Sequence, residues 1–529
     1  MVFAGFVEGF SDGLARCCRH QQQLLPGAGH GCQDVNTLPQ LSLRRRSRCR
    51  SQSRLWMASP HSGLNLPPGD KGLPLLGDFL SFTRGGAAGF EGKFEKYKSD
   101  VVTSRILTID TVLVKGFDQI RPILESPMEP AWPGTVDELL KGSMPTIKGE
   151  PHKARREIIS RIAFSRERLL SYAPFLQANV QQLIANIEAR TASSAQTYAR
   201  FRDEIEVMAF NAAAVLFLGA EDVYCGAGSG QKGDGLDIDE RLAQFQRFEG
   251  GLFTIPLKLP FLQTPWSEAL DAKAALLAFT RRAVEKRIEA KQQSGPLPTI
   301  TIMDHLVDMH LEGDGVLTKD IVISELLTLV WAGHSTILSF MQSMVYELFM
   351  GGTHDVVRRI RASAEYRAAL ESDEAWSHYL KLIIKPDLVN DTLLEIERLR
   401  PPVQSVFRKP PPGGMQVGAY HIPEGWTVLL SIFSTHRDPV YFPEPLAFRP
   451  ERFAESPELR KILLGFSGGA RVCIGKYYAE LFCRIFLLTF LRHGDVVMDP
   501  AQSREFSVLP GYSPKDGVLG RFQKLALSE

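Results

Sequence analysis

The chain has 529 residues, of which 44% are hydrophobic and 23% are charged, as is typical of a globular protein with a large core. Its 61 basic and 60 acidic residues nearly balance, which argues against a general nucleic-acid-binding surface. The composition also excludes a collagen-like chain, a fully disordered chain and a disulfide scaffold.

The first 60 residues differ from the rest of the chain. They contain eight arginines, no lysine and three acidic residues, a basic and acid-poor composition typical of organelle transit peptides. We therefore expect residues 1–60 to be a removable leader, and the protein to reside in a plastid or mitochondrion rather than in the cytoplasm or the endoplasmic reticulum. A disordered basic leader, or a true start at Met57, is the alternative. The leader has no apolar run of about 20 residues, so we expect at most peripheral contact with a membrane, without a spanning helix.

The body of the chain changes character along its length. Residues 101–115 are β-branched and partly alternating, which predicts strands. Helical periodicity dominates from about 150 to 345. Strand character returns at 410–430, and one strong helix, starting at Gly475, completes the predicted order. We therefore predict one large, mainly α domain with small β-sheets (α+β) over residues 64–529.

A cysteine in a glycine-rich loop is the sharpest local feature. Cys473 lies in the segment FSGGARVCIG, immediately before the amphipathic helix, where a thiolate would face the positive helix end and free backbone N–H groups; both should lower its pKa. Gly469 and Gly475 let the backbone approach a flat partner. Arg471 can neutralise an anionic group, and Phe466 can cover the site. This arrangement predicts a metal-bound thiolate; a core cysteine in a helix-entry loop is the alternative.

The spacing F-x-x-G-x-R-x-C-x-G matches the heme-binding signature of the cytochrome P450 superfamily at all five fixed positions, and the chain resembles this family. The resemblance implies the cytochrome P450 fold and a heme b cofactor whose iron is bound by the thiolate of Cys473. It makes Arg471 a partner of a heme propionate. Cys483, ten residues further along the helix, is expected to be a core residue.

Two further segments resemble the scaffold that holds this loop in the family. Glu395 and Arg398 are three residues apart on one helix face and resemble the E-x-x-R pair. Arg452, in the segment FRPERF, resembles the arginine that completes the buried network. The resemblance makes these three residues structural rather than catalytic. Glu397 and Arg400 have the same spacing, but in the family a proline follows three residues after the arginine, which selects Arg398.

Three basic residues resemble the family's contacts to the heme carboxylates. His152 and Arg156 are four residues apart on one helix face, and His152 stands where many members have tryptophan. Arg408 occupies a second propionate-contacting position. Two carboxylates in an apolar pocket need paired cations. For each arginine taken alone, a surface ion pair is the alternative.

The segment LTLVWAGHST resembles the long helix that crosses over the heme in the family. The resemblance implies that Ala332 and Gly333 leave room for dioxygen, and that Thr336 donates a hydrogen bond to it and locally opens the helix. The acid expected before the threonine is replaced by Ser335, which cannot shuttle protons as a carboxyl can. His334 could substitute, but it lies 100° away around the helix, so we expect an outward or packing role.

Short strings such as AGHST and IPEGW are most similar to the branch that hydroxylates retinoids and related isoprenoids. The resemblance implies a monooxygenase that uses O2 to hydroxylate or epoxidise a lipophilic substrate: an isoprenoid, retinoid, carotenoid, sterol or fatty acid. Electrons would come from a ferredoxin or an NADPH-dependent flavoprotein reductase. The apolar-rich segments 126–146, 252–265 and 403–406 are expected to contact the substrate.

The missing acid leaves a second function open. An oxygen-independent isomerase or dehydratase, acting on a lipid hydroperoxide or epoxide, needs neither a proton relay nor a reductase. A non-catalytic heme carrier or sensor is a third class, for which the intact motifs supply no reason.

Overall fold

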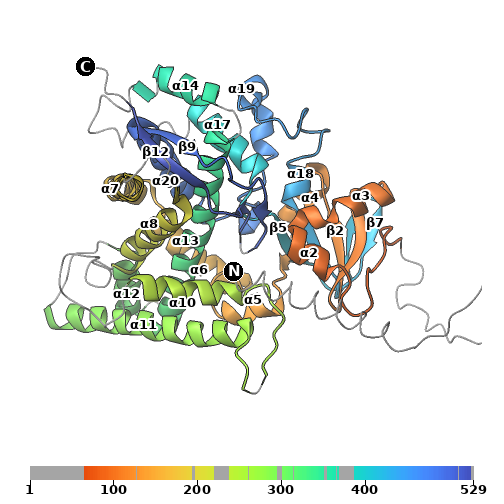
Figure 1. The fold of residues 1–529 in the computed structure, drawn as a ribbon. Helices are drawn as coiled ribbons and strands as arrows, with labels where there is room; N and C mark the ends of the chain where they lie inside the picture. The colour runs from red at the N-terminus through yellow and green to blue at the C-terminus, as the bar shows by residue number, and fades with distance from the viewer. Residues whose placement is uncertain are drawn as a thin grey trace, which may run out of the picture. The chain divides into compact units, whose positions relative to one another are not determined.

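The computed structural model describes most of the chain from Asn65 to Leu525 (Figure 1). Contacts group residues 64–529 into one unit, and the leader expected at residues 1–60 lies outside the described residues. The described ranges are 65–126, 128–192, 197–219, 238–259, 261–294, 301–313, 315–350, 354–364, 366–367, 387–509 and 511–525.

Helices dominate the described chain, and the predicted mainly α fold class with small sheets is confirmed (Figure 1). The longer ones fall in the region where helical periodicity is strongest. The helices are α2 (Phe79–Gly85), α3 (Glu91–Tyr97), α4 (Phe117–Glu125), α5 (Gly134–Leu139), α6 (Gly149–Ala163), α7 (Arg166–Thr191), α8 (Phe201–Leu218), α10 (Ile238–Gly250), α11 (Pro265–Ser294), α12 (Ile302–Glu312), α13 (Lys319–Phe349), α14 (His354–Ala362), α17 (Leu388–Leu399), α18 (Ile432–Thr435), α19 (Arg452–Glu455) and α20 (Lys476–His493), with short 3-10 turns η1 (Gly86–Phe90), η2 (Pro457–Lys461) and η3 (Gly469–Arg471).

The long helix α13 lies in the core and packs against α8, α11, α12 and α20. Thr318 sets its start, because the Thr318 side chain accepts a hydrogen bond from the backbone N–H of Ile321. Within the described ranges, α13 is the one helix long and apolar enough to span a membrane, with a mean hydropathy of 1.5 in its most apolar window. In that window, 67% of the residues are buried in the protein, as expected for a core helix.

The largest sheet joins two distant parts of the chain, in the strand order β1-β2-β8-β5-β3. The strands predicted at 101–115 are the antiparallel pair β1 and β2. The parallel pairing of β2 with β8 aligns Val112 with Val428, which brings the first strands beside the segment after α17. The strands are β1 (Val101–Ile106), β2 (Ile109–Val114), β3 (Glu129–Pro130), β5 (Ser405–Lys409) and β8 (Thr427–Ser431), with the separate hairpin β6 (Met415–Val417) and β7 (Tyr420–Ile422).

The prediction that the chain order closes on one strong helix is wrong. After α20 the chain forms β9 (Gly494–Met498), β10 (Phe506–Ser507), β11 (Ser513–Pro514) and β12 (Leu519–Lys524). β12 pairs with β9 and with β4 (Ala199–Arg200), which lies about 300 residues earlier. Strands this short carry little periodicity, and a partner so distant is not visible in a local pattern.

Candidate active site

The Cys473 loop is held tightly against α4. Gly469 has a φ of +62°, and a Cβ at this position would collide with the carbonyl oxygen of Leu124, so only glycine allows the close approach. The backbone N–H of Cys473 donates to the carbonyl of Phe466 at 2.9 Å, which closes the loop. α20 begins directly after Gly475. The Cys473 side chain remains accessible, whereas Cys483 is buried in the core.

The protonation of Cys473 departs from the expectation. The surrounding protein desolvates the thiol and raises its pKa above the usual value, even though part of the side chain is accessible. The backbone N–H of Gly475 and the charges of Arg156 and Lys476 lower the pKa. The helix end and the cations therefore act in the predicted direction, but desolvation outweighs them in the protein alone. A metal cation bound to the sulfur would favour the deprotonated ligand.

Glu395, Arg398 and Arg452 form a fully buried ionic network. Arg398 donates to both carboxylate oxygens of Glu395, at 2.8 and 2.9 Å, and Arg452 Nε lies 3.1 Å from each of them. Side-chain exposure is 0%, 0% and 3%, respectively. The remaining Arg398 donors reach backbone carbonyls of residues 436, 445 and 447. The network therefore fixes the segment between β8 and α19 to α17.

The other candidate pair, Glu397 and Arg400, does not form. Arg400 pairs instead with Glu347 of α13, Nε to Oε1 at 2.5 Å. Glu397 accepts from the backbone N–H of Gly465 at 3.1 Å, and burial, with a contribution from nearby Glu480, raises the pKa of Glu397 to about 7. Glu397 therefore ties α17 to the start of the cysteine loop.

His436 is a second support of the loop that the sequence did not indicate. Its Nε2 accepts from the backbone N–H of Leu464 at 2.8 Å, which requires a neutral ring. Burial, and then the positive charge of Arg398, lowers the pKa of His436 to about 3. The sequence signal was only its place in the HRDP string before the FRPERF segment.

The charge of Arg471 contributes to a lowered pKa at three other basic residues predicted to contact the heme carboxylates: His152, Arg156 and Arg408. Burial, followed by the charge of Arg471, lowers the pKa of Arg408 to about 10 and that of His152 to about 4. Burial also lowers the pKa of Arg156, with Arg471 acting in the same direction. Their acidic neighbour, Glu129, pairs with Arg471 at 2.8 Å. Glu129 acts on Arg471 and Arg408, and Arg156 is influenced by Arg471. Three guanidinium groups with this one acidic neighbour leave an excess of positive charge, which suits a ligand with two carboxylates.

On the opposite side of the core, α13 presents Ala332 and Thr336 as exposed side chains within an otherwise buried stretch. The Thr336 hydroxyl donates to the carbonyl of Ala332 at 2.9 Å. The helix is continuous through this point, so the predicted local opening is absent from α13. At Gly333, a Cβ would lie 2.9 Å from the ring of Phe217 on α8, so glycine permits close packing of α8. The room that Ala332 and Gly333 leave for dioxygen stays a prediction.

His334 has a packing role, and the outward alternative is excluded. Its side chain is 0% exposed and its ring stands edge-on to Phe210, with centroids 5.7 Å apart. Burial lowers the pKa of His334 to about 3, so the ring is neutral.

Ala332 and Thr336 border an apolar cavity of about 160 Å³. The three segments predicted to contact substrate contribute Trp132, Leu252, Phe253 and residues 403–406. Other lining residues carried no sequence signal, because they come from elements that only the fold brings to α13. The cavity is lined by Phe82, Gly86, Ala87, Trp132, Leu252, Phe253, Trp331, Ala332, Ser335, Thr336, Pro402, Val403, Gln404, Ser405, Val406, Phe407, Val508, Leu509 and Gly511.

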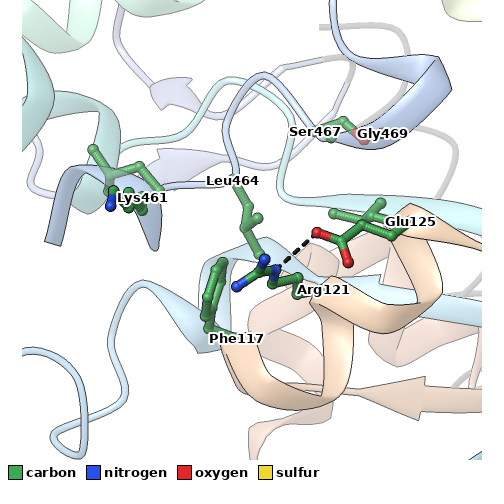
Figure 2. Close-up of a pocket in the computed structure, with 10 residues that line it drawn as sticks. Phe117, Arg121, Glu125, Lys461, Leu464, Ser467 and Gly469 are labelled. Carbon is green, nitrogen blue, oxygen red and sulfur yellow. Dashed lines mark hydrogen bonds and ion pairs between the residues drawn. The ribbon is translucent and has the colours of Figure 1, made fainter. Parts of the chain in front are cut away.

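A separate hollow of about 360 Å³ lies between α4 and the chain that leads into the cysteine loop (Figure 2). Arg121 pairs with Glu125 across one helical turn at 2.8 Å, on the α4 side. Lys461 lies on the other side, and Ser467 and Gly469 of the loop complete the lining. The hollow therefore exposes backbone close to Cys473 to an external partner.

These features define a heme-thiolate enzyme: an accessible cysteine on a clamped loop, an excess of cations beside it, and an apolar cavity against a long core helix. A family model described as Cytochrome P450 matches residues 67–511, and the chain belongs to this family. The family assignment made from the cysteine motif is confirmed.

Relatives of known name agree. Cytochrome P450 120 of Synechocystis sp. is 29% identical over 88% of this chain and 98% of its own length. Cytochrome P450 26A1 of Danio rerio is 25% identical, over 82% of this chain and 86% of its own. A solved structure described as "Retinoic acid bound cyanobacterial CYP120A1" superposes with a TM-score of 0.72 and 27% identity, covering 87% of this chain and all of its own.

The protein is therefore a heme-dependent monooxygenase, and the non-catalytic carrier or sensor is not supported. The residues present fit the cofactor: Cys473 offers the iron ligand, and Arg156, Arg408 and Arg471 offer the positive charge that two propionates require. His152, whose pKa is lowered to about 4, offers a neutral ring. When bound, the heme supplies the activation of dioxygen.

Proposed function

We propose that this monooxygenase hydroxylates or epoxidises a retinoid or related isoprenoid; sterols and fatty acids are the other lipophilic candidates. The observation that carries the proposal is the cavity beside Ala332 and Thr336, whose walls are mainly aromatic and aliphatic. Such walls favour an extended apolar ligand. The retinoic acid in the similar cyanobacterial structure supports the same class.

One polar group in the cavity suits a substrate that carries an oxygen. The Oε1 atom of Gln404 accepts from the backbone N–H of Ala87 at 3.0 Å, which fixes the orientation of the amide. Its Nε2 is buried and has no hydrogen-bond partner among the described residues. An unpaired buried donor is unfavourable, so we propose that Gln404 donates a hydrogen bond to a carbonyl, hydroxyl or carboxylate of the substrate.

Product analysis tests the proposal. The purified enzyme, with NADPH and either a ferredoxin system or a flavoprotein reductase, is incubated separately with retinoic acid, β-carotene, a sterol and a fatty acid. Oxygenated retinoid or carotenoid products are expected. Turnover of a lipid hydroperoxide without any reductant, and no NADPH-dependent product, would instead support the oxygen-independent isomerase.

The redox partner is proposed to dock over the hollow beside the cysteine loop. Lys461 and Arg121 offer exposed positive charge there, and both partner types are tested. Lys461→Glu should slow reduction by the partner protein and make it less sensitive to salt. Reduction by dithionite, which needs no docking, is the control.

We further propose that the loop between α10 and α11 contacts a membrane surface. Ile255, Leu257, Leu259, Phe261 and Leu262 are all exposed there, and Leu252 and Phe253 from the same loop line the cavity. Lipophilic substrate could thus enter from lipid. Leu257→Ser/Phe261→Ser should reduce sedimentation with lipid vesicles. An organelle location is proposed from the composition of residues 1–60, and a fluorescent protein carrying these residues tests it.

A further inference from the structure

Glu249, near the end of α10, is a buried carboxyl outside every motif of the sequence. Its side chain is 9% exposed. It faces α13 near the position where the expected acid is missing: Oε1 of Glu249 lies 3.9 Å from Nδ1 of His334, and the hydroxyl of the next residue, Ser335, lies beside the carboxyl and lowers its pKa. Ser335 also lines the cavity, next to Thr336. Ser335 therefore connects the carboxyl to the place where dioxygen and substrate must meet.

The groups around Glu249 do not hold its carboxyl in one protonation state. Within the described part of the chain, its Oε1 has no hydrogen-bond partner, and neither ring nitrogen of His334 has one. His334 Nδ1 lies 3.9 Å from that oxygen. The indole N–H of Trp331 lies beside the same carboxyl without a hydrogen bond of good geometry. No strong partner fixes the charge of Glu249.

A route to solvent leads away from Glu249 through α8 and α10. The nearest charges on α8 are Glu206 and Arg202, which act on Glu249 electrostatically. Glu206 accepts from Gln246 Nε2 at 2.9 Å and lies 3.6 Å from Arg202 Nε. Arg202 is 40% exposed, and Gln246 is exposed as well. Polar side chains thus connect the protein surface to Glu206, whose charge acts on Glu249.

Glu249 also titrates in a useful range. Burial, with Glu206 adding to it, raises the pKa of Glu249 to about 7, although hydrogen bonding from Ser335 and the charge of Arg202 lower it. A carboxyl of this kind can both hold and release a proton near neutral pH. His334 cannot do so, because its pKa lies near 3.

We propose that Glu249 replaces the acid missing from α13 and supplies protons through Ser335 to the Thr336 side of the cavity. Monooxygenation consumes O2, two electrons and two protons; one oxygen enters a substrate C–H bond and the other leaves as water. The electrons come from NADPH through the redox partner, and the protons come from solvent by way of Glu249. Glu249 acts through Ser335, so it is a proton-supplying, positioning residue.

The first test follows the fate of the electrons in holoenzyme with NADPH, partner protein and retinoic acid. Glu249→Gln keeps the shape but holds no transferable acid. It should lower product per NADPH about tenfold or more, with the electrons recovered as hydrogen peroxide. The double variant Glu249→Gln/Ser335→Glu returns a carboxyl to α13 and should restore much of the coupling. Unchanged coupling in Glu249→Gln, in protein with a normal CO spectrum, would overturn the proposal.

The turnover test rests in part on the proposed substrate, so failure of the wild type to oxidise retinoic acid contradicts only that substrate class. The electron partition is then measured without substrate, where proton supply still governs whether O2 leaves as peroxide or as water. A larger peroxide fraction in Glu249→Gln supports the proposal, and an equal fraction refutes it.

The second test needs no turnover. Because the folded-state pKa of Glu249 is raised, the folded chain holds more protons than the unfolded chain between pH 4.5 and about 7. Glu249 therefore makes wild-type stability fall as the pH rises from 4.5 to about 7. This loss of stability is absent in Glu249→Gln. The Tm of the variant minus that of the wild type should increase from pH 5 to pH 8. A flat difference would mean that Glu249 does not titrate there, and would refute the proposal.

Discussion

The two sides of the core differ in how their polar groups are satisfied. On the cysteine side, Glu395 accepts from two arginines whose other donors reach backbone carbonyls. On the α13 side, Glu249 Oε1, both nitrogens of His334 and Gln404 Nε2 have no hydrogen-bond partner among the described residues. The ionic network of the first region is fully paired, although Nδ1 of His436 beside it has no hydrogen-bond partner among the described residues. In the second region the unpaired groups lie in or near the cavity, where we propose that they serve substrate and protons.

We propose that this difference explains where the chain departs from its family. A saturated ionic network tolerates little change, because loss of one member leaves buried charges unpaired. The α13 side can exchange one acid for another on a neighbouring helix, provided that the carboxyl reaches the same point. Ser335 and Glu249 are consistent with such an exchange.

The largest effect is expected at Cys473. Cys473→Ser removes the iron ligand, and the red-shifted Soret band of the reduced, CO-treated protein should disappear completely. Cys483→Ala is the matched control, since Cys483 is buried away from the site, and it should keep the band. Persistence of the band in Cys473→Ser would contradict the assignment of the ligand.

Loss of the buried ionic network around Glu395 should destabilise the folded protein. Glu395→Gln leaves Arg398 and Arg452 as buried cations with no counter-ion, and the free energy of unfolding should fall by about 3–5 kcal/mol. Urea unfolding measures the change, and little heme should be incorporated. Glu505→Gln, at the exposed pair with Lys515, is the control and should leave stability nearly unchanged. Equal changes in the free energy of unfolding for the two variants would contradict a structural role of the network.

Substitution of Gly333 tests the packing of α13 against α8, and substitution of Ala332 tests access to the cavity. Gly333→Ala places a methyl group against Phe217 on the α8 side and should reduce stability by about 1–3 kcal/mol. Ala332→Val instead extends into the cavity and should weaken retinoic acid binding while preserving the Tm. Thermal unfolding and optical ligand titration measure the two effects. The opposite pattern would place Gly333 on the cavity side.

Two single residues, Glu249 on the α13 side and His436 on the cysteine side, should make stability respond to pH in opposite directions. Since the pKa of His436 falls from 6.5 to about 3 on folding, its stabilising contribution is complete above pH 6.5 and decreases as the pH falls below that value. The expected slope is about 1.4 kcal/mol per pH unit for one fully buried histidine. His436→Gln, whose amide oxygen can accept from Leu464, should remove this slope in urea unfolding at pH 5–7. An unchanged slope would mean that His436 is protonated in the folded protein.

The smallest effect is expected from removal of the leader. A chain that starts at Met57 should bind heme normally, show the same CO spectrum and stay largely soluble. The measurement is heme content per polypeptide, compared with the full chain. Failure of the shortened chain to fold would make the first 56 residues part of the domain.

Short-range motifs predicted the cysteine side well, because their residues are close in sequence. The Cys473 loop, and the Glu395–Arg398 pair on one helical turn, are local features whose spacing already sets their geometry. The strands at 101–115 were visible for the same reason. The α13 side was predicted less well: the sequence revealed the lost acid at Ser335 but not what faces it.

The sequence by itself thus determined the family and the cofactor, and it predicted Cys473 as the iron ligand. Only the tertiary structure decided that Gly333 faces Phe217, that Gln404 leaves a donor in the cavity, and that Glu249 reaches Ser335 from another helix. These contacts join elements about 85 to 320 residues apart, and a local pattern does not report which helix faces meet. The pairing of β4 with β12 was not predicted for the same reason: the two strands are far apart in the sequence, and such pairing is fixed by packing of the whole core.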